Sequence, residues 1–233
     1  LTSSRKQAIF DLWNGVNHTV NDGDYGRMTL YLSRSTNSGD QPFALTLRSG
    51  STGFNNLALG SSQASSSIMD GAWHHYAVTI QSASGDSLKA ELFIDGDLDY
   101  ATVSAGNYIP EIPIKASGLN ACLGSLITAS LDHLNTRVGD GKLSASMDDF
   151  RFWKVARTPE QISQTWNIPI GGGTNKHDSN KDLGLYFKFN EGVTGVSATD
   201  AKVLDYSGRI ANGEWTGYAS GSRKTTSAFV ESG

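Results

Sequence analysis

Two adjacent histidines, His74 and His75, are residues whose types suggest chemistry, because imidazole rings bind metals and transfer protons. They lie in residues 73–80, where Tyr76, Val78 and Ile80 alternate with polar residues in the pattern of a β-strand. Neighbouring residues of a strand point to opposite faces, so the two rings cannot converge on one ion. We therefore expect a structural role for this pair.

Carboxylates are the next candidates, because glycoside hydrolysis needs two of them facing each other across the scissile bond. Asp148 and Asp149 are adjacent in a predicted strand and should point to opposite faces. No E-x-D-x-x-E run occurs, and no nucleophile elbow, P-loop, dinucleotide fingerprint or zinc-type cluster is present. The sequence therefore predicts a protein that is not an enzyme. The glutamates are scattered along the chain: Glu91, Glu111, Glu160, Glu191, Glu214 and Glu231.

Calcium is the cofactor for which the sequence offers ligands. Asp178, Asn180 and Asp182 alternate as oxygen donors do in a calcium-binding loop. The following glycine, Gly184, comes one place late for such a loop, and no glutamate stands at the twelfth position. A calcium site and a solvated loop both remain open here.

Aromatic residues in turn-rich segments could stack on the apolar faces of sugars, while nearby polar groups bind the hydroxyls. The alternative is burial in the core. The candidate ligand-binding residues are Trp13, Tyr25, Tyr108 and Trp215.

The elements that would position these residues are short strands. The 233 residues include 26 glycines and are 38% hydrophobic, a composition typical of strands joined by tight turns. Alternation places Met28, Leu30 and Leu32 on one face of a strand, and a further strand ends at Asp95-Gly96, a dipeptide typical of a type I′ hairpin. Thr158, with Pro159 and Gln161 behind it, predicts a short capped helix near residues 158–167.

Charge and hydropathy limit the partners. The formal net charge is −4 without a block of Lys or Arg, which argues against nucleic acid. No apolar run is long enough to span a bilayer, so we expect no membrane insertion. A single cysteine, Cys122, cannot form an internal disulfide.

The expected organisation is a body over residues 1–170, a glycine-rich polar linker or loop over 171–182, and a C-terminal segment over 183–233. Residues 185–189 alternate as a strand, which either closes the body or opens a second repeat. The chain starts at Leu1, directly before a strand pattern, so we expect a piece of a longer protein.

Three ordered segments resemble the laminin G-like jelly-roll family of the concanavalin A-like lectin/glucanase superfamily, in its pentraxin-related branch. These are residues 71–79 (GAWHHYAVT), 91–96 (ELFIDG) and 146–162 (SMDDFRFWKVARTPEQI), within a likeness that spans most of residues 7–167. Residues 185–192 (LYFKFNEG) with 205–213 resemble the usual beginning of such domains, although here they come last. The resemblance implies an all-β, antiparallel two-sheet jelly-roll sandwich.

The resemblance also implies a function. We expect a non-catalytic glycan-binding or adhesive module of a larger multidomain or multimeric assembly, extracellular, on a cell surface or in a virion. The alternative is a structural assembly or decoration domain of a virus or phage particle, or of an extracellular structure, whose partners are neighbouring protein subunits. Fold analogy alone does not separate the two.

Overall fold

A five-stranded antiparallel sheet with the order β4-β3-β2-β1-β8 forms one layer of the computed structural model. The structure describes residues 7–16, 23–32, 42–60, 65–114, 118–127, 141–171, 180–219 and 221–222. The strands of this sheet are β1 (Gln7–Trp13), β2 (Gly26–Leu32), β3 (Phe43–Ser49), β4 (Thr52–Leu59) and β8 (Asn120–Leu123).

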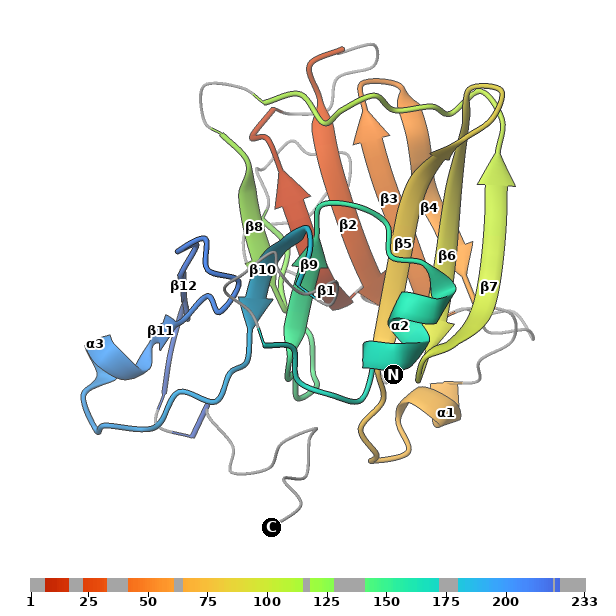
Figure 1. The fold of residues 1–233 in the computed structure, drawn as a ribbon. Helices are drawn as coiled ribbons and strands as arrows, with labels where there is room; N and C mark the ends of the chain where they lie inside the picture. Colours follow the sequence, from red (N-terminus) through yellow and green to blue (C-terminus); the bar gives the residue numbers. More distant parts are fainter. Residues whose placement is uncertain are drawn as a thin grey trace. The chain divides into compact units, whose positions relative to one another are not determined.

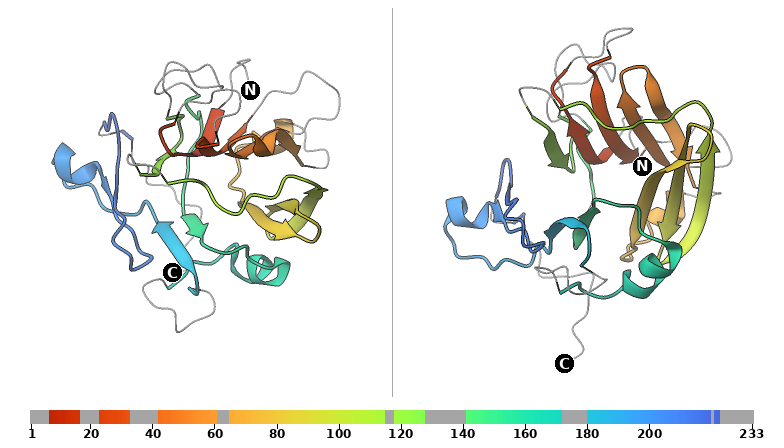
Figure 2. Two further views of the ribbon diagram at one scale, coloured as in Figure 1. Left: turned by 90° about the horizontal axis from the view of Figure 1, so that it is seen from above. Right: turned by 45° about the horizontal axis from the view of Figure 1, so that its top comes forward.

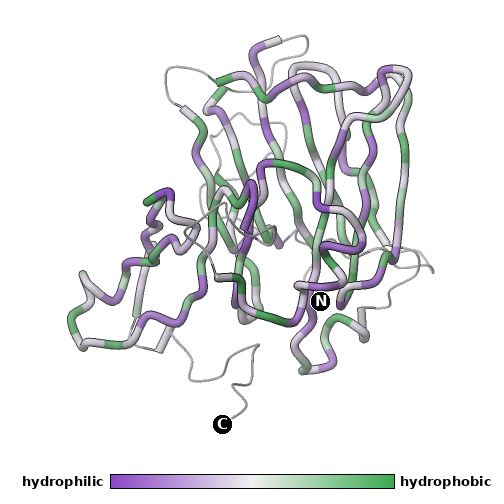
Figure 3. The backbone as a smooth tube through the Cα atoms, in the orientation of Figure 1, coloured by the Kyte–Doolittle hydropathy of each residue, from purple (hydrophilic) through white to green (hydrophobic). Residues whose placement is uncertain are grey.

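The register of this sheet follows the alternation in the sequence. Met28 lies opposite Leu47 and Leu30 opposite Leu45, so the apolar residues of β2 and β3 share one face, as predicted. Figure 3 shows apolar and polar residues alternating along these strands. The first five residues of β3 are all buried, so both faces of the sheet are covered there.

A three-stranded sheet with the order β5-β6-β7 forms a second layer (Figure 2). Its strands are β5 (Tyr76–Ala83), β6 (Ser87–Ile94) and β7 (Asp97–Ser104). Leu92 of β6 is fully buried, and a Cβ atom at Gly60, just after β4, would lie 3.7 Å from its side chain. The sheets therefore pack face to face, which confirms the predicted all-β sandwich.

The turn between β6 and β7 confirms the predicted type I′ hairpin. Asp95 and Gly96 have φ values of 50° and 90°, the left-handed conformation that this turn requires at both central residues. Glycine adopts it without strain, and aspartate is among the residues that tolerate it best.

A buried ion pair ties together the strands at the centre of the larger sheet. The Arg27 guanidinium donates from Nε and Nη2 to the Asp11 carboxylate at 2.9 and 2.6 Å, and both side chains are fully buried. Thr29 Oγ1 and the backbone N–H of Ile127 also donate to Asp11, each at 2.7 Å. The carboxylate thus receives four hydrogen bonds, which compensates for its removal from water.

The remaining elements are short. Helix α1 (Ser65–Ile68) precedes β5 in the chain, and β9 (Phe150–Trp153) pairs antiparallel with β10 (Leu183–Phe187). Helix α3 (Ser197–Asp200) is followed by the paired strands β11 (Lys202–Val203) and β12 (Gly213–Glu214). Within the described part of the chain, no helix is both long and apolar enough to cross a membrane.

The capped helix predicted near residues 158–167 is α2 (Pro159–Thr165). The Gln161 backbone N–H donates to Thr158 Oγ1 at 3.3 Å, and the Thr158 backbone N–H donates to Gln161 Oε1 at 3.0 Å. This reciprocal capping box confirms the predicted helix start.

The chain divides into two compact units. Most of the linker or loop expected over residues 171–182 lies outside the described residues, so that boundary stays a prediction. Unit 1 comprises residues 1–72, 78–93 and 98–145, and unit 2 comprises residues 73–77, 94–97 and 146–233. Strand β10 has a neighbour in the same unit, β9, along which it pairs from Leu183 to Phe187. Whether residues 183–233 also begin a further repeat stays a prediction.

Candidate functional site

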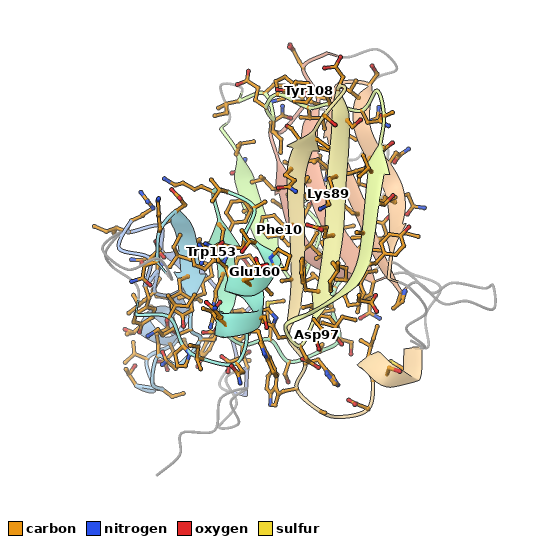
Figure 4. The ribbon with its side chains drawn as sticks, turned by 45° about the vertical axis from the view of Figure 1, so that its right-hand side comes forward. Phe10, Lys89, Asp97, Tyr108, Trp153 and Glu160 are labelled. Carbon is orange, nitrogen blue, oxygen red and sulfur yellow. The ribbon has the colours of Figure 1, made fainter. Side chains whose placement is uncertain are left out.

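Several turns of unit 1 gather at one end of its two sheets, where the structure places Tyr108. Figure 1 shows this end, with the β3–β4 and β5–β6 turns and the chain that follows β7. Tyr108 lies in the segment 105–114 after β7, and Figure 4 labels it at the same end. Its backbone N–H donates to the Asp86 carbonyl in the β5–β6 turn at 3.2 Å.

Glycines on β2 and β4 leave the space into which the segment 105–114 packs. A Cβ atom at Gly53 would lie 2.4 Å from the Ile109 side chain and 2.1 Å from the Leu47 carbonyl oxygen. A Cβ atom at Gly26 would lie 2.7 Å from the side chain of Ile112. Real Cβ atoms do not approach so closely, so only the absence of a side chain lets the segment pack against β2 and β4.

A buried amide fixes the end of the same segment. Asn14 Nδ2 donates to the Asp24 carbonyl at 2.7 Å and to the Pro113 carbonyl at 2.9 Å. Asn14 is fully buried, so these bonds join the turn before β2 to the segment after β7 in a place closed to water. The segment is therefore held at Tyr108, Ile109, Ile112 and Pro113.

This anchoring leaves the Tyr108 side chain at the surface, with 41% of its area exposed. Asp86 and Glu111 are exposed next to it in the fold and in the chain, and the half-buried Asn107 donates from Nδ2 to Ser104 Oγ at 2.6 Å. An aromatic ring on a fixed backbone beside carboxylates and an amide can stack on a sugar face and bind its hydroxyls. We take Tyr108 and its neighbours Asp86, Asn107 and Glu111, the Tyr108 surface, as the candidate site.

The structure corrects two of the predicted ligand-binding residues. Trp13 is 5% exposed; its indole N–H donates to the Val16 carbonyl at 2.8 Å, and the Arg27 guanidinium lies 5.2 Å from its ring centroid. Tyr25 is fully buried, and burial raises the pKa of its hydroxyl well above the usual value. Rings enclosed in this way cannot stack on a sugar, so both belong to the core.

The fourth predicted residue, Trp215, lies in unit 2 just after β12. Its side chain is half-buried and meets Tyr218 edge-on at 6.0 Å between ring centroids. Its backbone N–H donates to the Ala201 carbonyl at 2.7 Å. Trp215 is therefore engaged in local packing, and its role in binding stays a prediction.

The structure describes two of the three predicted calcium ligands, Asn180 and Asp182. Asp178 lies outside the described residues, Asn180 is 3% exposed and Asp182 is half-buried. The backbone carbonyls of Asn180 and Asp182 accept the N–H groups of Leu183 and Lys154 at 3.1 and 2.9 Å. Among the described residues, no group of three or more His, Cys, Asp or Glu side chains is placed to hold a metal ion.

The adjacent histidines lie just before β5 rather than within it, which corrects the prediction that both belong to a strand. His74 Nδ1 lies 2.7 Å from Asp95 Oδ2, and the backbone N–H of His75 donates to Asp95 Oδ1 at 2.7 Å. Asp95, in the β6–β7 turn, therefore holds both residues within unit 2. The structural role expected for the pair agrees with these contacts.

Trp166 and Arg151 lie near the His75 ring in unit 2. The His75 ring lies 6.4 Å from that of Trp166, and a Cβ atom at Gly96 would lie 2.4 Å from the Trp166 indole. Burial and the nearby Arg151 guanidinium lower the pKa of His75 to about 4, an effect that Asp95 partly offsets. His75 is therefore neutral at physiological pH.

Sequence reasoning missed the exposed aromatic residue Trp73. It is 39% exposed, although it stands within the motif of residues 71–79, whose pattern predicts a strand rather than a binding surface. Trp73 and Tyr108 are the large aromatic side chains that stand exposed among the described residues. Asp86, Asn107 and Glu111 were also missed, because the sequence does not show that the β5–β6 turn meets the segment after β7.

Several buried carboxylates are held by neighbouring groups. Glu91 accepts a hydrogen bond from Thr79 Oγ1 at 3.0 Å, and its other oxygen lies 2.7 Å from Lys89 Nζ. Asp149 pairs with Arg151 and accepts a hydrogen bond from Tyr186 Oη at 2.6 Å. Contacts of this kind compensate for the removal of these carboxylates from water.

A match to a protein-family model agrees with this architecture. Residues 3–163 match the family model described as the concanavalin A-like lectin/glucanases superfamily. A similar solved structure is that of a Bacteroides ovatus ATCC 8483 protein with a provisional assignment as carbohydrate binding, at 19% identity and a TM-score of 0.47. The alignment covers 90% of this chain and 51% of that one, so this chain spans about half of its length. No curated protein matches the sequence.

Proposed function

Because the chain belongs to the concanavalin A-like lectin/glucanase superfamily, we propose that it is a non-catalytic module that binds glycans through the Tyr108 surface. The observation that carries the proposal is an exposed ring, 41% accessible, on a backbone segment that is anchored on both sides. A ring held in this way loses little conformational entropy when a ligand covers it.

Binding is favoured over hydrolysis by the state of the carboxylates. The superfamily includes both lectins and glucanases, and a glucanase requires a facing pair of carboxyl groups. Asp11, Glu91 and Asp149 are each engaged by buried or half-buried partners. The exposed acids next to Tyr108 can accept hydrogen bonds from sugar hydroxyls without breaking such contacts.

Tyr108 is favoured over Trp73 by the same reasoning. Next to Trp73 in the chain, His74 and His75 already contact both carboxylate oxygens of Asp95. The acids beside Tyr108 are exposed at the surface. A sugar on Tyr108 therefore gains stacking and hydrogen bonds together, whereas Trp73 offers chiefly its ring.

A glycan array tests this proposal with the wild-type protein, Tyr108→Ala and Tyr108→Phe. We expect wild-type binding to weaken at least about tenfold in Tyr108→Ala, a loss of about 1.4 kcal/mol. Tyr108→Phe keeps the ring and should retain most of the affinity. Val103→Ala, which removes an apolar side chain that is 57% exposed on β7, is the matched control and should bind like the wild type.

The other outcomes separate the alternatives. Equal binding by Tyr108→Ala and the wild type, with loss in Trp73→Ala, would move the site to unit 2. No binding on any array, together with an ordered interface with a protein partner, would favour the structural assembly module. Release of reducing ends from a bound glycan would contradict the non-catalytic part. We further propose that the module acts outside cells or on a virion, where glycans are displayed.

A further inference from the structure

We propose that the Tyr108 surface binds linear glycans along their length, with successive sugar residues lying on the segment 105–114 from Tyr108 to Ile114. This inference rests on the proposed glycan-binding function and adds the ligand class, which is a stretch of an unbranched chain rather than a single terminal sugar. It is carried by the path of this segment across the strand ends of the larger sheet.

The segment crosses several strands of the larger sheet. The Ile109 side chain occupies the space left by Gly53 on β4, and the Ile112 side chain occupies the space left by Gly26 on β2. In the strand order β4-β3-β2-β1-β8, β3 lies between these two strands. Figure 1 shows the chain after β7 running across this end of the sheet.

The path continues past β2 to the end of β1. Asn14, which follows β1, donates from Nδ2 to the Pro113 carbonyl at 2.9 Å. From β4 to β1 there are three strand spacings of about 4.8 Å, or about 14 Å in all. The chain from Ile109 to Pro113 reaches that far only when it is largely extended. A ligand on this segment therefore meets an extended and anchored backbone.

Apolar side chains are exposed at both ends of this path. Tyr108 is 41% exposed and Ile114 is 72% exposed, and Pro110 and Glu111 are exposed between them. Exposed apolar groups on an anchored backbone offer contact area to the apolar faces of sugars at little cost in entropy.

The length of the path decides which ligand can use both ends. The chain from Tyr108 to Ile114 spans up to about 20 Å. One sugar ring is no larger than the tyrosine ring on which it would stack, so it cannot contact both ends. A linear chain of several sugars can.

Size-graded fragments of linear glucans, mannans and chitin, from the monosaccharide to the hexasaccharide, test this inference. We expect the hexasaccharide of a backbone that binds to be held at least about tenfold more tightly than its monosaccharide, because contacts along the segment are added. Isothermal titration calorimetry gives the dissociation constants.

Ile114→Ala separates the two ends of the surface. It should weaken hexasaccharide binding about three- to tenfold and leave monosaccharide binding unchanged, because a single sugar on Tyr108 does not reach residue 114. Tyr108→Ala should weaken both. Leu98→Ala is the matched control, since it removes an apolar side chain that is 50% exposed at the start of β7, the end of that strand remote from the segment. It should bind both lengths like the wild type.

Methyl NMR of the isoleucine-labelled wild type gives a second measurement, which does not depend on the folding of a variant. The Ile114 methyl signals should shift with the hexasaccharide and stay in place with the monosaccharide. Equal affinity for both lengths, unmoved Ile114 methyl signals at saturation, or binding on the array without affinity for any of these fragments overturns this inference alone. Absence of all glycan binding overturns the proposed function as well.

Discussion

Acid should destabilise this protein through His75, and the size of the effect follows from the pKa of its ring. Burial, with the Arg151 guanidinium, lowers that pKa from 6.5 to about 4 in the folded chain. The unfolded chain therefore binds a proton near pH 6.5, which the folded chain accepts only near pH 4. The contribution of the neutral His75 ring to the free energy of unfolding is fully present above pH 6.5. It is lost as the pH falls from 6.5 towards 4.

The magnitude is worked out by linkage. The full shift of 2.5 pKa units, 6.5 minus 4, corresponds to roughly 3 kcal/mol as an upper value. Between about pH 7.5 and pH 5 the expected loss from His75 is about 2 kcal/mol. Other titrating groups add their own dependence, so the prediction is the difference between the wild type and a variant that lacks this imidazole.

His75→Phe is the suitable variant, because it keeps a planar ring against Trp166. Nδ1 of His75 is buried without a hydrogen-bond partner among the described residues, so little polar contact is lost there. Urea unfolding followed by tryptophan fluorescence at several pH values gives the free energy of unfolding for both proteins. The wild type should lose about 2 kcal/mol more than His75→Phe between about pH 7.5 and pH 5.

Equal losses in both proteins would refute this reasoning. If His75→Phe fails to fold, NMR titration of the wild-type imidazole gives the same test. Its resonances should change near pH 4, and a midpoint close to 6.5 would show that the ring is not desolvated as the structure indicates.

Three further predictions concern the core, the anchored segment and calcium. Asp11→Ala should cost about 3–5 kcal/mol in urea unfolding, because it leaves Arg27 charged and buried; a loss below about 1 kcal/mol would contradict the buried pair. Gly26→Ala should lower the free energy of unfolding by about 1–3 kcal/mol, because its Cβ atom would press on Ile112. Adding Ile112→Ala should restore part of that stability, whereas losses that simply add in the double variant would argue against the contact. A calcium site at residues 178–182 predicts that EDTA lowers the unfolding temperature, that added Ca²⁺ restores it, and that Asp182→Asn removes this response; an unchanged temperature would exclude the site.

Much of the fold could be predicted because its determinants are local. The capping box joins Thr158 to Gln161, three residues away, and the β6–β7 turn needs only Asp95 and Gly96. Alternation along β2 and β3 assigns apolar residues to one face without knowledge of the partner strands.

The site was harder to predict, because burial depends on distant segments. Trp13 and Tyr25 lie in or near turn-rich sequence, yet Arg27 lies against the Trp13 ring and the Gly50 N–H donates to the Tyr25 carbonyl. His74 and His75 leave the strand pattern because the Asp95 carboxylate, about twenty residues along, binds both. The acids around Tyr108 come from separate turns that only the folded sheets bring together.

The Tyr108 ring itself offers the most direct test of the proposed glycan-binding surface. Tyrosine ring resonances can be followed by NMR during titration with a glycan selected on the array, with Tyr108→Phe used to assign the signal. We predict that the Tyr108 ring signals shift in a saturable manner and that those of the buried Tyr25 do not. Saturable binding that leaves the Tyr108 signals unchanged would contradict the proposed site.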